Sequence, residues 1–311
     1  MKTFFAGLIA VLFVSRVSAQ VMVELSFDQE QFLPSESVPL TVKITNRSGE
    51  QLHLGADPDW LTFSVEAADG FVVIKSGEVP VLGEFDLESA QEATKRVDLQ
   101  PYFAMTKPGR YRVTATLRIK AWSSHVTSTP KSFDVINGAK LWAQDFGVPG
   151  EPGHPPEARK YTLEQANYLK EQLRLYVQLS DVAEARVYKV TALGPMVSFS
   201  HPEAQVDRMS QLHVIWQTGG QSFSYVLVYP NGTIGQQETY DNFISRPRLT
   251  VNDEGEVEVT GGTRRMKSSE YPTVRMPAEL PGSVKLATNA PAAKVQTTTN
   301  ASEPNKSPRT R

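Results

Sequence analysis

The stretch of sequence that decides the fold is KPGRYRVTATLRIK, residues 107–120. After a Pro-Gly turn, apolar side chains occupy every second position and alternate with arginine and threonine; they are Tyr111, Val113, Ala115, Leu117 and Ile119. Alternation with a period of two is typical of a β-strand that buries one face and exposes the other. The stretch therefore predicts one long strand at the surface of a packed core.

The same alternation recurs upstream of this strand. Apolar residues at every second position begin at Val21, Val38 and Leu61, and turn-forming residues separate these runs. Several half-buried strands need a second sheet to cover their apolar faces. The sequence therefore predicts an all-β protein whose first domain, residues 20–137, is a β-sandwich.

Tyr111 directly follows the turn, and Val113 stands two positions later. In immunoglobulin-like sandwiches a tyrosine at this place forms a corner, and its hydroxyl bonds back to the backbone. The other interpretation is an ordinary half-buried strand tyrosine. We expect structural roles for Tyr111, for Gly109 in the turn, and for Trp60 as a core aromatic.

Two further segments, FLPSESV at residues 32–38 and ITN at residues 44–46, together with PGRY at 108–111, resemble bacterial secreted immunoglobulin-like domains. The resemblance covers residues 21–135. It implies an immunoglobulin-like β-sandwich and carries little information about function, because one fold hosts many functions.

Residues 138–160 are rich in Pro and Gly, including the run GVPGEPGHPP at 147–156. Proline removes backbone donors and glycine adds conformational freedom, so such a run disfavours a helix or a central strand. We expect a semi-rigid linker there.

A second, smaller β domain is predicted over residues 161–266. Residues 162–175 are ambiguous: Thr162 with Gln165 fits a helix cap, whereas alternating apolar residues fit a hairpin that turns at residues 170–172. The turns at 230–232 and 252–255 favour two further hairpins, which resemble pieces of propeller blades. The length suffices for about two blades, fewer than a closed propeller needs. A small sheet or sandwich is therefore expected.

The two ends of the chain differ in composition from the rest and from each other. Residues 1–19 have a basic start, a short apolar run and small residues before Gln20, which predicts a cleavable signal peptide and a secreted or periplasmic protein. Residues 267–311 are low in large apolar residues. From Lys285 onward they carry five basic residues against Glu303, which predicts a disordered, mildly basic tail.

Composition excludes several chemistries. The absence of cysteine excludes disulfides, thiolate metal sites and thiol nucleophiles. Cleavage would remove Lys2 and Arg16 and leave 30 of the 32 basic residues against 34 acidic ones, a balance that argues against nucleic-acid binding. We also expect no membrane insertion after signal cleavage, and no metal or cofactor.

No residue pattern predicts a catalytic site. The five histidines are scattered, and no nucleophile motif is present. A metal at His201 and Glu203, or calcium at Asp57 and Asp59, is disfavoured against an ordinary turn. Four aromatic residues could stack on sugars, although at strand spacing a core position is more common; they are Trp122, Trp142, Trp216 and Tyr240.

Taken together, these features predict a secreted or envelope-associated, non-enzymatic binding or structural protein. Its partner would be an unidentified envelope protein or polysaccharide. Two alternatives stay open: an extracellular hydrolase or accessory domain acting on envelope polysaccharide, and a sandwich resembling a protease inhibitor that presents loops.

Overall fold

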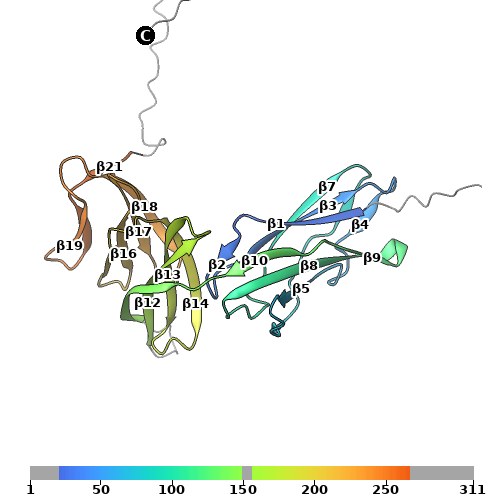
Figure 1. Ribbon diagram of the computed structural model, residues 1–311, viewed down its shortest axis with the longest axis horizontal. Helices are drawn as coiled ribbons and strands as arrows, with labels where there is room; N and C mark the ends of the chain where they lie inside the picture. The colour runs from blue at the N-terminus through green and yellow to red at the C-terminus, as the bar shows by residue number, and fades with distance from the viewer. Residues whose placement is uncertain (1–20, 149–155, 267–311) are drawn as a thin grey trace, which may run out of the picture. The chain divides into compact units, whose positions relative to one another are not determined.

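The computed structural model describes residues 21–148 and 156–266, and within them the chain is almost entirely β-structure (Figure 1). The fold class predicted from the alternation is confirmed. The one helical segment of the described residues is a single 3-10 turn, η1 (Lys120–Trp122). No helix within the described residues has the length and apolar character that spanning a membrane requires.

Residues 21–136, called here the N-terminal sandwich, contain two main sheets. One sheet has the strand order β1 (Val21–Phe27), β3 (Pro39–Asn46), β7 (Glu92–Asp98). The other has the order β2 (Gln31–Phe32), β10 (Lys131–Val135), β8 (Gly109–Ile119), β5 (Leu61–Ala67), with β9 (Ser124–Thr127) also paired to β8. A short pair, β4 (Leu52–Leu54) and β6 (Phe85–Leu87), completes this part.

The connections in this sandwich cross repeatedly from one sheet to the other. Strands β1, β3 and β7 take the places of strands A, B and E of an immunoglobulin sandwich, and β5, β8 and β10 take those of C, F and G. Strand β2 pairs in parallel with β10. The strand order therefore matches that of an immunoglobulin-like sandwich.

The buried faces of the two sheets share one hydrophobic core. The alternating residues of β8, from Tyr111 to Ile119, are at most 2% exposed, which is the burial that the sequence pattern indicates. The Tyr111 ring stacks on Phe133 of β10, with ring centroids 5.7 Å apart. The position of each apolar residue in β8 thus follows from the two-residue period of the strand.

Residues 139–265, called here the C-terminal sheets, form two antiparallel meanders in which strands pair in chain order. The first contains β11 (Ala139–Val148), β12 (Glu157–Tyr168), β13 (Gln172–Asp181) and β14 (Val187–Pro195). The second contains β15 (Glu203–Val206), β16 (Leu212–Gln217), β17 (Ser222–Val228) and β18 (Ile234–Asp241), with β21 (Thr263–Arg264) paired to β18. The inner faces of the two meanders share one core, which includes Tyr161, Val177, Val214 and Val228.

A small hairpin of β19 (Arg248–Val251) and β20 (Val257–Thr260) follows β18 and lies outside both meanders. Leu249 and Val259 of this hairpin pack against a second cluster on the outer face of the β15–β18 sheet. The cluster consists of Ile215, Phe223, Tyr225 and Tyr240. The hairpin therefore covers part of a sheet face that would otherwise expose aromatic side chains.

The linker predicted over residues 138–160 is wrong in most of its length. Residues 139–148 form β11, and residues 157–160 already belong to β12, with which β11 pairs from Ala139↔Gln165 to Val148↔Glu157. The Pro/Gly run thus connects two paired strands, and the second β part begins near residue 139 instead of 161. The average composition of residues 138–160 is that of a linker, so it did not indicate β11. This strand forms because β12 supplies the partners for its backbone hydrogen bonds. Residues 149–155 lie outside the described residues.

The ambiguous segment 162–175 is a hairpin and not a helix. Strands β12 and β13 pair from Arg159↔Asp181 to Tyr168↔Gln172, and Leu169 and Lys170 have positive φ in the turn. The predicted signal peptide, residues 1–19, and the predicted tail, residues 267–311, lie outside the described residues.

Candidate functional site

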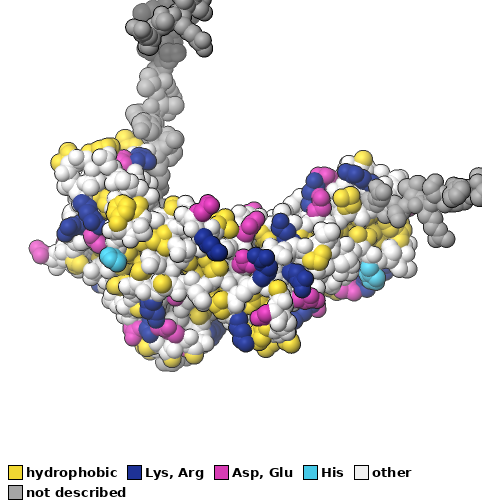
Figure 2. Space-filling model, viewed as in Figure 1, with side chains coloured by type: hydrophobic (Ala, Val, Ile, Leu, Met, Phe, Trp, Pro, Cys, Tyr) yellow, Lys and Arg dark blue, Asp and Glu magenta, His cyan; other side chains and the backbone are white. Residues whose placement is uncertain are grey.

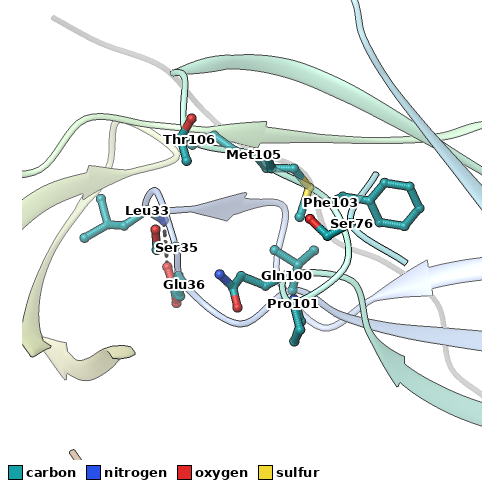
Figure 3. Close-up of a pocket in the computed structure, with 12 residues that line it drawn as sticks. Leu33, Ser35, Glu36, Ser76, Gln100, Pro101, Phe103, Met105 and Thr106 are labelled. Atoms are coloured by element: carbon teal, nitrogen blue, oxygen red, sulfur yellow. Dashed lines mark hydrogen bonds between the residues drawn. The ribbon is translucent and has the colours of Figure 1, made fainter. Parts of the chain in front are cut away.

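A cavity of about 220 Å³ lies in the N-terminal sandwich between two loops (Figure 3). One loop joins β2 to β3, and the other joins β7 to β8. The labelled side chains in the close-up include Leu33, Ser35, Glu36, Gln100, Phe103 and Met105. Glu36 is the one ionisable side chain among the residues that line this cavity.

Glu36 is 5% exposed, and both of its carboxylate oxygens accept hydrogen bonds. The Leu33 N–H donates to Oε2 at 2.7 Å, and Gln29 Nε2 donates to Oε1 at 3.0 Å. Ser35 has φ of +63°, and the Glu36 N–H donates to the Leu33 carbonyl, so the carboxylate closes a tight turn. Burial raises the pKa of Glu36 above its ordinary value, while these donors and Arg174 oppose the rise. The carboxylate is therefore engaged in holding the turn.

The same turn contacts the C-terminal sheets. Leu33 packs with Ala166, Tyr176 and Val190 in a small buried cluster. Nearby, the Leu169 N–H donates to Gln31 Oε1 at 2.6 Å. The cavity thus borders a junction at which the two β parts of the chain share apolar and polar contacts.

His213, on β16, is the buried histidine of the described chain. Its Nδ1 is 2.9 Å from the Tyr225 hydroxyl, and its Nε2 is 3.2 Å from Asp207 Oδ2. Burial, followed by the charges of Glu238 and Asp207, raises the pKa of Tyr225 to about 12. Both ring nitrogens thus lie within hydrogen-bond distance of side chains of the same chain, so that Asp207, His213 and Tyr225 form one continuous row. The arrangement is that of a structural hydrogen-bond chain.

A second cavity, of about 280 Å³, lies beside Trp60 and is bordered by charged residues. His53 at its edge lies 2.7 Å from Asp86 Oδ1 and 2.5 Å from Glu84 Oε1, and these contacts raise the pKa of His53. Asp57 forms ion pairs with Arg118 and Lys120, each at 3.3 Å. Charges of both signs are therefore neutralised locally at this cavity.

Large apolar side chains stand exposed on loops in both parts of the chain. In the N-terminal sandwich, the long connection between β5 and β6 exposes Val72, Ile74 and Leu82. In the C-terminal sheets, the connections β14–β15 and β18–β19 expose Phe199, Phe243 and Ile244, by 75%, 68% and 95%. Sequence reasoning missed both groups, although the apolar pair Phe243-Ile244 within a turn-rich segment was a readable signal.

The three structural residues named from the sequence occupy the N-terminal sandwich. Tyr111 is 1% exposed, and its hydroxyl donates to the Lys107 carbonyl at 2.7 Å, which is the geometry of a tyrosine corner. Trp60 is 3% exposed and donates from Nε1 to the Val81 carbonyl at 2.9 Å. Gly109 has φ of +155°, a conformation that side-chain-bearing residues rarely adopt.

The other residues considered from the sequence do not form a site together. Asp59, like Asp57, pairs with Arg118, and Glu203 accepts a hydrogen bond from the Leu249 N–H. Within the described residues no group of three or more metal-binding side chains is gathered in one place. Among the four aromatic candidates for sugar stacking, Trp216 and Tyr240 are buried, and Trp122 and Trp142 are half-buried.

Comparison with known proteins adds little to this picture. No family model matches the chain, and no curated protein matches it. Among solved structures, the chain is similar to Spo0M, a sporulation control protein from Bacillus subtilis, with 10% sequence identity and a TM-score of 0.28. The alignment covers 79% of this chain and 89% of Spo0M.

Proposed function

We propose that this chain is an exported, non-enzymatic binding protein of the cell envelope. In this proposal, an immunoglobulin-like sandwich of the bacterial secreted type is joined to a second β part, and the loops of both meet partners. The signal-like sequence at residues 1–19 supports export. Loops carried on a rigid β scaffold are where such folds usually place recognition.

The observation that carries the proposal is a contrast between two kinds of side chain. Buried polar side chains form internal hydrogen bonds, whereas several large apolar side chains are exposed at the surface. Glu36 and His213 are used in hydrogen bonds that hold a turn and a sheet face. The exposed apolar side chains of the β5–β6 loop and of the C-terminal loops have no such internal role. Several large apolar side chains exposed on neighbouring loop positions favour binding to another molecule.

The test uses the mature chain, residues 20–311, added to isolated envelope fractions from the host. We expect the chain to sediment with the envelope and to show no turnover on a panel of hydrolase substrates. Two triple serine variants, one at Val72, Ile74 and Leu82 and one at Phe199, Phe243 and Ile244, locate the surface responsible. At least one should reduce sedimentation.

Wild-type protein that stays in the supernatant would contradict the proposal. Hydrolysis that is lost on replacing Asp207 or His213 would favour the enzyme alternative. Circular dichroism of each variant serves as the control for folding.

A further inference from the structure

Three exposed apolar residues of the C-terminal sheets, Phe199, Phe243 and Ile244, belong to two connections that a hydrogen bond joins. Arg246 Nη2 donates to Ser200 Oγ at 3.2 Å, which ties the loop of Phe243 and Ile244 to that of Phe199. The Gly262 N–H donates to the Ser245 carbonyl at 3.0 Å and fixes a third connection beside them. We call Phe199, Phe243 and Ile244 the apolar tip. Figure 2 shows apolar side chains scattered among polar ones over the visible face of both β parts.

Positive charge accompanies the apolar tip. The guanidinium of Arg246 lies 5.3 Å from the centroid of the Phe223 ring. Neither Arg246 nor Arg248 forms an ion pair with any residue that the structure describes. By contrast, Arg265 is paired with Asp241 at 2.5 Å. Two arginines close to the tip in sequence thus keep an uncompensated charge.

The chain leaves this region through β21, and a basic segment follows later in the sequence. Strand β21 pairs Thr263 with Asp241 and Arg264 with Tyr240, so the last described strand adjoins the strand that leads into the Phe243 loop. From Lys285 to Arg311 the sequence carries five basic residues and one acidic residue. Residues 263–264 are thus the last described strand before the basic segment in the sequence.

We propose that the apolar tip contacts an anionic lipid bilayer, with Phe199, Phe243 and Ile244 in the interfacial region and the arginines near the head groups. This inference rests on the proposed function and names the partner of one of its two loop groups. Stable attachment to a membrane surface generally needs two signals, such as exposed apolar side chains and basic residues, and the apolar tip with Arg246 and Arg248 offers both kinds. Aromatic side chains are favoured at the interface between lipid and water. The contact is shallow and requires no spanning segment.

The experiment measures cosedimentation of the mature chain with vesicles of phosphatidylethanolamine and phosphatidylglycerol, and with vesicles of phosphatidylcholine alone. We expect binding to the anionic vesicles that weakens as salt is raised, because charges at the surface are screened. The variant Phe243→Ser with Ile244→Ser should bind about tenfold more weakly, since two apolar side chains no longer leave water. Met209→Ser, at an apolar residue that is 65% exposed and belongs to neither of the two loop groups, is the matched control and should bind as wild type does.

Three outcomes would overturn the inference. They are absence of binding to anionic vesicles, equal loss in the Met209→Ser control, and binding that Phe243→Ser with Ile244→Ser leaves unchanged. A dimer in solution that this variant dissociates, without vesicle binding, would assign the tip to a second copy. Retention by whole envelope fractions without binding to pure lipid would refute this inference and leave the proposed function standing.

Discussion

Both β parts of this chain pack sheets around a hydrophobic core of their own, but their strands are connected in different ways. In the N-terminal sandwich, neighbours in a sheet are distant in sequence, as in the pairing of β5 with β8. In the C-terminal sheets each strand of a meander pairs with the next one, as β12 does with β13. Meander pairing is local and can be inferred from adjacent segments, whereas the crossing connections depend on which distant strands share a core.

The largest expected effect compares one buried tryptophan from each part. Trp60→Ala and Trp216→Ala should each lower the free energy of unfolding by about 3 to 5 kcal/mol, since both are 3% exposed and leave a large cavity. Chemical denaturation measures the loss. Trp122→Ala, at a half-buried position, is the control and should cost less. Equal losses at all three positions would contradict the difference in burial between them.

The next prediction concerns the turn that joins the two parts. Glu36→Ala removes the acceptor of the Leu33 N–H and should lower the free energy of unfolding by about 1 to 3 kcal/mol. Glu36→Gln keeps an acceptor and should cost less at neutral pH. Glu66→Ala, at an exposed position, is the control for removal of a surface carboxylate. An equal decrease in its free energy of unfolding would contradict a specific role for Glu36 in the turn.

The pH dependence of the stability of the Glu36 variants tests whether burial raises the pKa of Glu36. The pKa of Glu36 is raised in the folded state, so its protonated form favours folding. That contribution is complete below the ordinary pKa of 4.5 and is lost as pH rises through the folded-state pKa. The stability of Glu36→Gln relative to wild type, measured by denaturation at several pH values, should therefore increase from pH 4.5 upward. A decrease would contradict the assignment.

A smaller effect compares one tyrosine hydroxyl from each part. Tyr111→Phe removes a 2.7 Å bond to the Lys107 carbonyl and should cost about 0.5 to 1.5 kcal/mol. Tyr161→Phe removes longer bonds, 3.2 Å to the Ser210 carbonyl and 3.4 Å to the Val228 carbonyl, and should cost less. Thermal unfolding of both variants measures the difference, and the reverse order would count against this ranking.

The smallest effect lies at the surface. The contacts with Asp86 and Glu84 raise the pKa of His53, so NMR titration of its ring should give a pKa above 6.5. Asp86→Asn should move the pKa back toward 6.5. Because the folded-state pKa is the higher one, any contribution of His53 to stability should fade as pH rises through it. An unchanged pKa in Asp86→Asn would show that Asp86 is not the main cause.

The sequence by itself determined the fold class and the N-terminal sandwich. The two-residue period of residues 111–119 defines which face of β8 is buried, because successive side chains of a strand point to opposite sides. The Pro-Gly turn before Tyr111 likewise indicated the corner, since that signal is local.

Only the tertiary structure decided the parts that depend on distant partners. Strand β11 was concealed by the Pro/Gly run and is defined by its pairing with β12. The turn at Leu169 and Lys170 lacks glycine or asparagine, and Gln31, far away in the sequence, accepts the Leu169 N–H. The connections that carry Phe199 and Phe243 are joined by the bond from Arg246 to Ser200, which no local pattern shows. In each case the contact joins residues that are far apart in the sequence. Hydrophobic periodicity predicts which face of a strand is buried, but it does not predict which strand pairs with it.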